Sequence, residues 1–195
     1  MTRNVLLIQG HPDAERTHFC HALEDAYCEG VASAGHSLRR ICIAGLDFPL
    51  LRSQREWQHS ALPQALGGSQ QALEWAGHVA LIFPLWLGDM PALVKGFLEQ
   101  VARPGFAFSP RADHPFAAGR LRGRSARIVV TMGMPASVYR WYFGAHSVRS
   151  LERNILGFVG FSPVERTLIG SVDQLQDGAG ARWLARMRRL GERGQ

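Results

Sequence analysis

Short apolar runs alternate with stretches of helical spacing along the 195 residues of this chain. Apolar runs of about four to eight residues between turn residues are typical of buried strands, and apolar positions three and four apart indicate helices. Five such runs predict strands, at residues 4–9, 38–44, 78–83, 125–131 and 164–170. Helical spacing predicts helices at residues 17–34, 69–76, 91–101, 136–158 (with a break near Gly144) and 173–190.

Strands that alternate with helices predict an α/β fold in which helices cover both faces of a parallel sheet. Right-handed crossovers and one reversal of direction leave few topologies, and the doubly wound order 2-1-3-4-5 fits best. Residues 46–68 and 111–124 have the composition of irregular loops, and we expect one domain over residues 1–195. In this order the loops after strands one, three and four meet at one switch point, where open α/β proteins bind ligands.

The first of these loops, residues 10–20, joins a strand end to a helix start. Such a junction binds anions through free backbone N–H groups and the helix dipole. Thr17 can cap the helix or donate its hydroxyl to a phosphate, and His11 and His18 can donate ring N–H groups. The same residues fit an ordinary loop with a threonine cap equally well. The loop has no Walker or GxGxxG pattern, so it does not favour a nucleoside triphosphate.

The second loop starts after the run 78–83 and passes into a helix at Pro91. A flat, mostly apolar ring with one polar edge requires aliphatic or aromatic walls and backbone hydrogen-bonding groups. The residues that offer these features are Leu85, Trp86, Leu87 and Gly88. The alternative is that Trp86 packs in the core. Gly96, inside the following helix, costs about 1 kcal/mol relative to alanine and therefore predicts close packing against a neighbouring element.

The third loop, residues 131–135, continues into a helix that contains Tyr139. Its backbone N–H groups could bind a carbonyl oxygen of a ligand. Tyr139 could act as a preorganised donor that stabilises negative charge as it develops on that ligand. His146 could assist Tyr139, and the alternative for His146 is a histidine at the surface or between packed helices.

The charge balance favours no nucleic-acid partner, although 22 Lys and Arg against 16 Asp and Glu give a net charge of +6. The arginines near the end of the chain follow helical spacing opposite apolar residues, which indicates a solvated helix face. They lack the interleaved aromatic residues that single-strand binding uses. No apolar run is long enough to span a membrane, and the first run is too short for a signal-peptide core.

The cysteine and histidine spacings predict neither disulfides nor a metal site. Cys20, Cys28 and Cys42 form no zinc ribbon or redox pair, so reduced thiols in a cytoplasmic protein are the simplest interpretation. His18 and His21 flank Cys20, but no carboxylate pair or Cys/His spacing completes a metal site, and we expect none.

The segment 84–108, PLWLGDMPALVKGFLEQVARPGFAF, resembles the flavodoxin-like NAD(P)H:quinone oxidoreductases, whose pattern is roughly PLWW-xxx-PA-x-LKG followed by GFAF. The first loop has the family's GHP opening, and residues 16–20 match an RSxxN-like helix start. The third loop resembles the family's TTGG followed by a tyrosine. The resemblance extends over residues 10–169. The departures from the family pattern are Cys20 for asparagine, Leu87 for an aromatic residue, Met132 for threonine and Met134 for glycine.

The resemblance implies a flavodoxin-like fold and a ping-pong reaction, in which a flavin takes hydride from NAD(P)H at N5 and reduces a quinone or similar acceptor. We expect FMN, with FAD as the alternative, because the end of the chain has no obvious adenosine-holding extension; NADH and NADPH both remain open. The implied catalytic residues are Tyr139 and His146. The implied flavin-binding residues are His11, Thr17, His18, Phe19, Cys20, Pro84, Leu85, Trp86, Leu87, Gly88, Thr131, Met132, Gly133, Met134 and Tyr139.

The resemblance also implies a homodimer with its sites at the subunit interface. The aromatic-rich stretch from Val138 to Phe143 supports this expectation, because a monomer could not bury it fully. The alternative to an enzyme is a non-catalytic role. Relatives of this family serve as ancillary subunits that bind nucleotide or flavin and regulate potassium-efflux systems, which would give the chain a membrane-protein partner.

Overall fold

The computed structural model describes residues 2–15, 17–109, 119–175 and 178–195. At its centre lies an all-parallel five-stranded sheet with the order β2-β1-β3-β4-β5, which confirms the predicted topology. The central strand β3 is buried along its whole length, whereas the edge strands β2 and β5 are partly exposed. The strands are β1 Asn4–Gln9, β2 Ser37–Cys42, β3 His78–Pro84, β4 Ser125–Thr131 and β5 Val164–Ile169.

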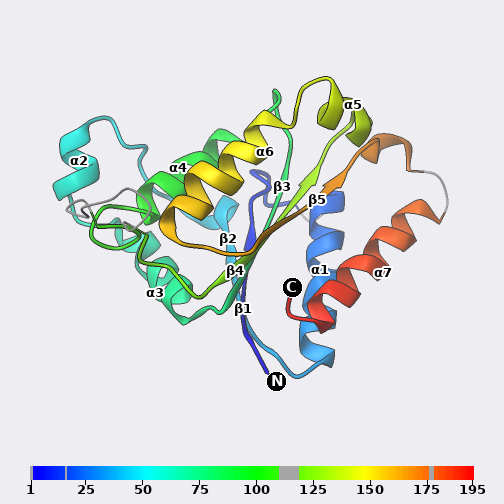
Figure 1. The fold of residues 1–195 in the computed structure, drawn as a ribbon, viewed down its shortest axis with the longest axis horizontal. Coiled ribbons are helices and arrows are strands. Elements are labelled where there is room, and N and C mark those ends of the chain that lie inside the picture. Colours follow the sequence, from blue (N-terminus) through cyan, green and yellow to red (C-terminus); the bar gives the residue numbers. More distant parts are fainter. Residues whose placement is uncertain (1, 16, 110–118, 176–177) are drawn as a thin grey trace.

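Helices cover both faces of this sheet (Figure 1). One face is covered by α1 Phe19–Ser33 and α7 Ala179–Glu192. The other face is covered by α3 Gly67–Trp75, α4 Ala92–Val101, α6 His146–Ser150 and the π-helical segment η4 Leu151–Gly157. Successive side chains of a strand point to opposite faces. Val5 and Leu7 accordingly pack in the core under α1 and α7, while Leu6 and Ile8 pack in the other core.

Two short helices lie outside these layers (Figure 1). Helix α5 Ala136–Trp141 lies beyond the carboxyl ends of the strands, and α2 Gln54–His59 projects to the side of the sheet. The 3₁₀ turns are η1 Ile43–Gly45, η2 Gln64–Leu66 and η5 Val172–Gln174. No helix in the described part of the chain is both long enough and apolar enough to cross a membrane.

Glycines allow the closest contacts between elements. A Cβ added at Gly30 of α1 would lie 2.0 Å from the Arg188 carbonyl oxygen, so α1 and α7 approach backbone to backbone. A Cβ at Gly96 in α4 would lie 2.7 Å from the Leu50 side chain. The close packing predicted for Gly96 is therefore confirmed.

Several predicted boundaries are wrong. The second strand ends at Cys42, because residues 43–45 form a separate 3₁₀ turn. Helix α1 begins at Phe19 with His18 as its N-cap, so Thr17 is not the cap. Helix α7 begins at Ala179, because residues 172–174 form a separate 3₁₀ turn. Helix α2 lies within the stretch 46–68 that we predicted to be irregular, and Ser53 caps it by accepting from the Glu56 N–H. The predicted break near Gly144 is confirmed, with a φ of 63°. Of the predicted loop 111–124, residues 111–118 lie outside the described residues.

Candidate functional site

The three predicted loops meet at the carboxyl edge of the sheet. The Cys20 thiol lies 3.1 Å from the Thr131 hydroxyl, which joins the first loop to the third. The Leu85 N–H donates to the Thr131 carbonyl at 2.7 Å, which joins the second loop to the third. The rings of His11 and Trp86 lie 6.1 Å apart edge to face, which joins the first loop to the second. The convergence that we derived from the strand order is thus present in the structure.

Gln9, the last residue of β1, fixes the shape of the first loop. Its buried side-chain amide donates to the Cys20 carbonyl at 3.2 Å and to the Glu24 carboxylate at 3.0 Å. Its amide oxygen accepts from the His11 N–H at 3.0 Å. The sequence analysis missed Gln9. The available signal was a polar residue at the end of an otherwise apolar strand.

Histidine rings cluster in the first loop. The rings of His11 and His18 stack with their centroids 3.9 Å apart, and His21 lies 5.4 Å from His11. Burial and the neighbouring His18 lower the pKa of His11 below its ordinary value, so His11 is neutral at neutral pH. Its Nδ1 accepts from the Asp13 N–H at 3.1 Å, which leaves Nε2–H as a donor. Asp13, also missed from the sequence, lies 2.9 Å from His18 Nε2.

The side chains of this cluster are not arranged as a set of metal ligands. Across residues 2–15, 17–109, 119–175 and 178–195, no group of three or more His, Cys, Asp and Glu side chains is arranged to hold a metal ion. The hydrogen bond from His18 also lowers the pKa of Asp13. The cluster therefore combines hydrogen-bond donors with a paired carboxylate rather than a set of metal ligands.

The start of α1 keeps the electrostatic character of an anion site. No side chain caps its first turn, and no acidic residue lies in that turn. The helix dipole and the backbone N–H groups at this end therefore favour a bound anion. Thr17 is exposed beside this end and His18 is half-buried, while Arg16 lies outside the described residues.

The second loop is a tight turn that exposes apolar side chains. Trp86 and Asp89 exchange two backbone hydrogen bonds, of 2.8 and 3.0 Å. Leu87 and Gly88 between them have φ values of 49° and 81°, the positive signs that a type I′ turn requires. This conformation is strained for leucine. The side chain of Leu87 is fully exposed and that of Trp86 is 48 % exposed, so Trp86 does not pack in the core.

A hydrogen-bonded chain from α5 and α6 supports this turn. The Tyr139 hydroxyl lies 2.6 Å from the Ser147 hydroxyl, and Ser147 donates to the Gly88 carbonyl at 2.8 Å. The proton of Ser147 is thus committed to Gly88, so Tyr139 is the donor to Ser147. Tyr139 is only 2 % exposed. The sequence analysis missed Ser147, because no local pattern distinguishes it from other serines on helices.

His146 lies apart from this chain. Its ring lies over Gly144, where an added Cβ would be 2.7 Å from Nε2. The side chain is exposed at the start of α6. Over the described residues the structure shows no hydrogen bond from the His146 ring to the three loops.

The third loop offers two free donors. The Met132 N–H donates to the Ile169 carbonyl at 2.9 Å and its side chain is buried, so Met132 supports the loop from within. The N–H groups of Gly133 and Met134 donate to no residue in the described part of the chain. Gly133 also needs its small size, because a Cβ there would lie 2.8 Å from the Asp173 carboxylate.

The predicted site residues therefore fall into two groups. Those that reach the surface or lie half-buried are Thr17, His18, Phe19, Leu85, Trp86, Leu87, Gly88, Gly133 and Met134. Those buried beneath them are His11, Cys20, Pro84, Thr131, Met132 and Tyr139. Burial raises the pKa of the Cys20 thiol to about 11, so it stays protonated where it meets Thr131. The first group is accessible at the surface, and the second group lies beneath it.

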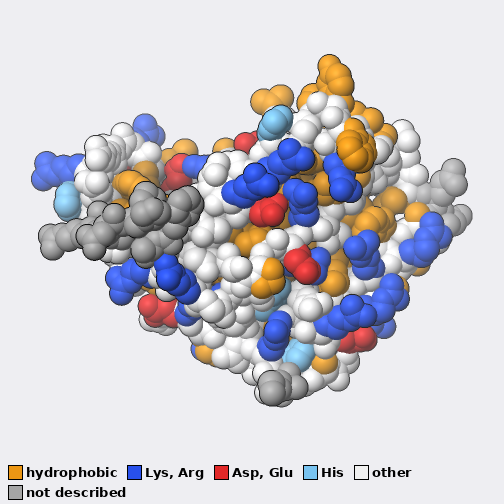
Figure 2. All heavy atoms as spheres, viewed as in Figure 1, with side chains coloured by type: hydrophobic (Ala, Val, Ile, Leu, Met, Phe, Trp, Pro, Cys, Tyr) orange, Lys and Arg blue, Asp and Glu red, His pale blue; other side chains and the backbone are white. Residues whose placement is uncertain are grey.

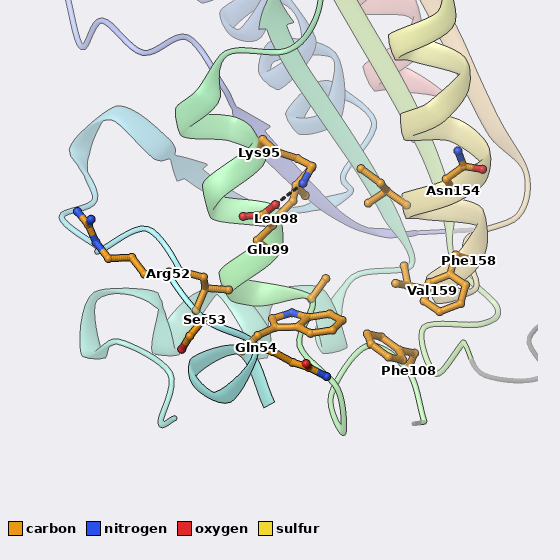
Figure 3. Close-up of a pocket in the computed structure, with 14 residues that line it drawn as sticks. Arg52, Ser53, Gln54, Lys95, Leu98, Glu99, Phe108, Asn154, Phe158 and Val159 are labelled. Carbon is orange, nitrogen blue, oxygen red and sulfur yellow. Dashed lines mark hydrogen bonds and ion pairs between the residues drawn. The ribbon is translucent and has the colours of Figure 1, made fainter. Parts of the chain in front are cut away.

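A separate apolar hollow of about 670 Å³ lies along the far half of α4 (Figure 3). The rings of Phe108 and Phe158 lie 5.1 Å apart in its wall, and Trp57 lies 5.7 Å from Phe108. The Lys95–Glu99 ion pair lies on α4 at its rim (Figure 3). Within one chain this hollow is distant from the three loops, which meet at the opposite end of α4.

Comparison with known proteins agrees with this architecture. Over 195 aligned residues the chain is 25% identical to NAD(P)H dehydrogenase (quinone) 1 of Rattus norvegicus, covering 87% of this chain and 69% of the relative. The NAD(P)H:quinone oxidoreductase of Methanothermobacter marburgensis has a similar structure, with a TM-score of 0.80, 24% identity and coverage of 98% and 96%. An FMN-dependent NADH-azoreductase of Bacillus anthracis, solved in complex with FMN, has a TM-score of 0.74 at 13% identity, with 99% of each chain covered. The profile of the flavodoxin-like fold family Flavodoxin_2 matches residues 3–190, and the chain belongs to this family.

Proposed function

We propose that this protein is a flavin-dependent NAD(P)H:quinone oxidoreductase. The observation that carries the proposal is the convergence of three loops that together offer a helix start without a side-chain cap hydrogen bond, an exposed apolar turn and two free backbone donors. Those three features match the phosphate, the ring and the polar edge of a flavin. The rat relative is itself named a quinone dehydrogenase, and this name supports the same activity here.

The residues present fit FMN. The start of α1 with Thr17 and His18 would hold the phosphate, because free N–H groups and the dipole point there. Trp86 and Leu87 would form a wall against the ring. The N–H groups of Gly133 and Met134 would bind the pyrimidine carbonyl. When bound, FMN supplies the chemistry, accepting a hydride from the nicotinamide nucleotide and passing it to the acceptor.

The protein's own contribution is to position the flavin and to exclude water from it. Tyr139 and Ser147 hold the Gly88 carbonyl, and through it the strained turn that carries Leu87. Tyr139 remains our candidate functional residue, and we propose that it acts by positioning this turn, because its hydroxyl proton is donated to Ser147 and the Ser147 proton to Gly88. His146 is a weaker candidate for the catalytic role, because its ring packs over Gly144.

We also propose a cytoplasmic homodimer with its sites at the subunit interface. The side chain of Tyr142 is 82 % exposed, and Val138 and Phe143 beside it are also exposed. Such aromatic surface is typical of an interface. The three loops are open to solvent in one chain, and a second copy would close them and keep water from the flavin. Cys20, Cys28 and Cys42 form no disulfide in the structure, and this state suits a reducing compartment.

The decisive experiment is the spectrum of the purified protein. We expect a yellow protein that releases FMN on heating, is bleached by NADPH or NADH and is reoxidised by a quinone. Sedimentation at micromolar concentration should give a dimer. A protein that binds no FMN when reconstituted, or binds FMN that neither nucleotide bleaches, would contradict the enzyme and favour a non-catalytic subunit.

A further inference from the structure

A second hollow, of about 500 Å³, lies beside the edge strand β5. It is lined chiefly by Ser137, Arg140 and Trp141 of α5, Arg149 of α6, and Arg166 and Leu168 of β5. Figure 2 shows Lys and Arg side chains gathered over α6 and on toward α7 on the face that contains β5. None of these residues takes part in the three loops described above.

The register of the sheet places this hollow next to the third loop. Leu168 pairs with Val130 and Arg166 pairs with Ile128, while the third loop starts at Thr131. Residues two apart on a strand share a face, so Arg166 and Leu168 both point toward α5 and α6. Arg166 pairs with Ile128, which lies three residues before the start of the third loop at Thr131. Three residues of strand span about 10 Å, so the hollow extends about 10 Å from that loop along the sheet edge. An extended dinucleotide is longer than this distance.

The hollow carries an excess of positive charge. Arg166 has one carboxylate partner, Glu152, at 3.3 Å. Arg140 and Arg149 have no ion-pair partner among the residues that the structure describes. The lining thus carries three guanidinium groups and one neighbouring carboxylate, an excess of positive charge that a bound anion would offset. A guanidinium donates two parallel hydrogen bonds, and this geometry matches a phosphate.

Trp141 adds an aromatic surface to these charges. Its side chain is 78 % exposed, and the Arg140 guanidinium lies 5.4 Å from its ring centroid. Exposed aromatic rings stack on nucleobases, and arginine strengthens such stacking. Ser137, Arg140 and Trp141 lie three and four residues apart on α5, so they share one side of the helix. Val138 and Tyr142 lie on a neighbouring side and stay available to the proposed dimer interface.

We infer that this hollow binds the adenosine 2′-phosphate end of NADPH and makes NADPH the preferred nucleotide. The inference rests on the proposed function, which places the nicotinamide at the three loops. Arginine near the adenosine ribose is the feature that accommodates a 2′-phosphate, whereas NADH presents only a hydroxyl there. Arg149 and Arg140 hold the phosphate, and Trp141 stacks on the adenine.

The first test compares the two nucleotides as substrates. We expect wild-type kcat/KM to be higher for NADPH than for NADH, and Arg149→Gln to reduce that ratio about tenfold, the low end for a lost charged hydrogen bond. Arg149→Lys keeps the positive charge but cannot donate two parallel hydrogen bonds, and it should reduce the NADPH/NADH ratio less. Arg189→Gln on α7 is the matched control, because it removes an exposed arginine outside the hollow, and the ratio should not change. Equal use of both nucleotides by the wild type, or a ratio untouched by Arg149→Gln, would overturn the inference.

The second test needs no turnover. Calorimetry should show that adenosine 2′,5′-bisphosphate binds wild type at least tenfold more tightly than AMP, and that Arg149→Gln removes the difference. If AMP binds equally well, or if inorganic phosphate competes as strongly as the bisphosphate, the hollow does not recognise this nucleotide. If the bisphosphate binds through Arg149 but neither nucleotide bleaches the flavin, the proposed function fails and the binding site stands. Circular dichroism of each variant checks that it is folded.

Discussion

The chain from Tyr139 through Ser147 to the Gly88 carbonyl gives the sharpest test of the site. Tyr139→Phe removes the donor to Ser147, and Ser147→Ala removes the donor to Gly88. Either change removes support from the turn in which Leu87 has a strained φ of 49°. We therefore expect each variant to bind oxidised FMN and to be reduced more slowly by NAD(P)H.

The magnitude follows from what is lost. A neutral hydrogen bond contributes about 1 kcal/mol, and the strained leucine conformation costs about 1–3 kcal/mol to maintain. Loss of about 1 kcal/mol of support lowers the equilibrium constant for the competent turn about fivefold, and so lowers the reduction rate by up to about fivefold. The double variant should be no slower than either single variant, because both changes break the same chain.

Stopped-flow bleaching of the flavin measures this step alone. Ser150→Ala is the matched control for Ser147→Ala, because it deletes a hydroxyl from an exposed serine on the same helix, and it should reduce at the wild-type rate. If Tyr139→Phe is slow but Ser147→Ala reduces like wild type, Tyr139 does not act through Ser147. A direct hydrogen bond to the reduced flavin would instead cost about ten- to a hundredfold in Tyr139→Phe alone. Wild-type rates in both variants would remove the chain from the mechanism.

Three further predictions test other parts of the structure. Thr17→Glu should abolish FMN binding in a fluorescence titration, because a carboxylate would face the phosphate at an exposed helix start. The circular dichroism spectrum should stay unchanged. Undiminished affinity for FMN would place the phosphate elsewhere. Gly191→Ala should lower the melting temperature strongly, because its Cβ would lie 2.2 Å from the Tyr27 carbonyl oxygen. Gly180→Ala should raise the melting temperature slightly, because the nearest atom to its Cβ lies at 3.9 Å. Similar shifts in the two variants would contradict the packing. Burial lowers the pKa of His78 to about 3, so the unfolded chain protonates this residue below about pH 6.5 while the folded protein does not. The free energy of unfolding should therefore fall between about pH 6.5 and 3, and the fall should be shallower in His78→Gln in denaturant titrations; equal slopes would refute this.

The strands and their order could be predicted because they depend on simple physical patterns. Strand β4 has the predicted bounds, since its apolar run ends where the turn residues begin. The convergence of the loops then follows from topology alone. Helix α2 escaped prediction because it buries no residue, so its sequence has no apolar period. Its only signal is the capping box Ser53–Glu56, in which the two residues satisfy backbone groups at the helix start.

The site was predicted less completely, for reasons that lie in tertiary contacts. The sequence places Thr17 at a helix start, but the choice of His18 as cap depends on the stack with His11 and the bond to Asp13. Tyr139 was identified by its position after the third loop. Its partner Ser147 comes from another helix, and local sequence carries no information about such a pair.

The close contact between α1 and α7 has a consequence for synthesis of the chain. The core on this face is completed by α7, whose Met187 and Leu190 pack in one cluster with Leu23, Tyr27 and Val31 of α1. Ribosomes make the chain from the N-terminus, so this face of the sheet has only one of its two helices until α7 emerges. The nascent protein therefore carries an open apolar surface on this face until α7 has been made. Aggregation and chaperone capture should concentrate in that interval, and pauses in translation just before residue 179 should prolong it.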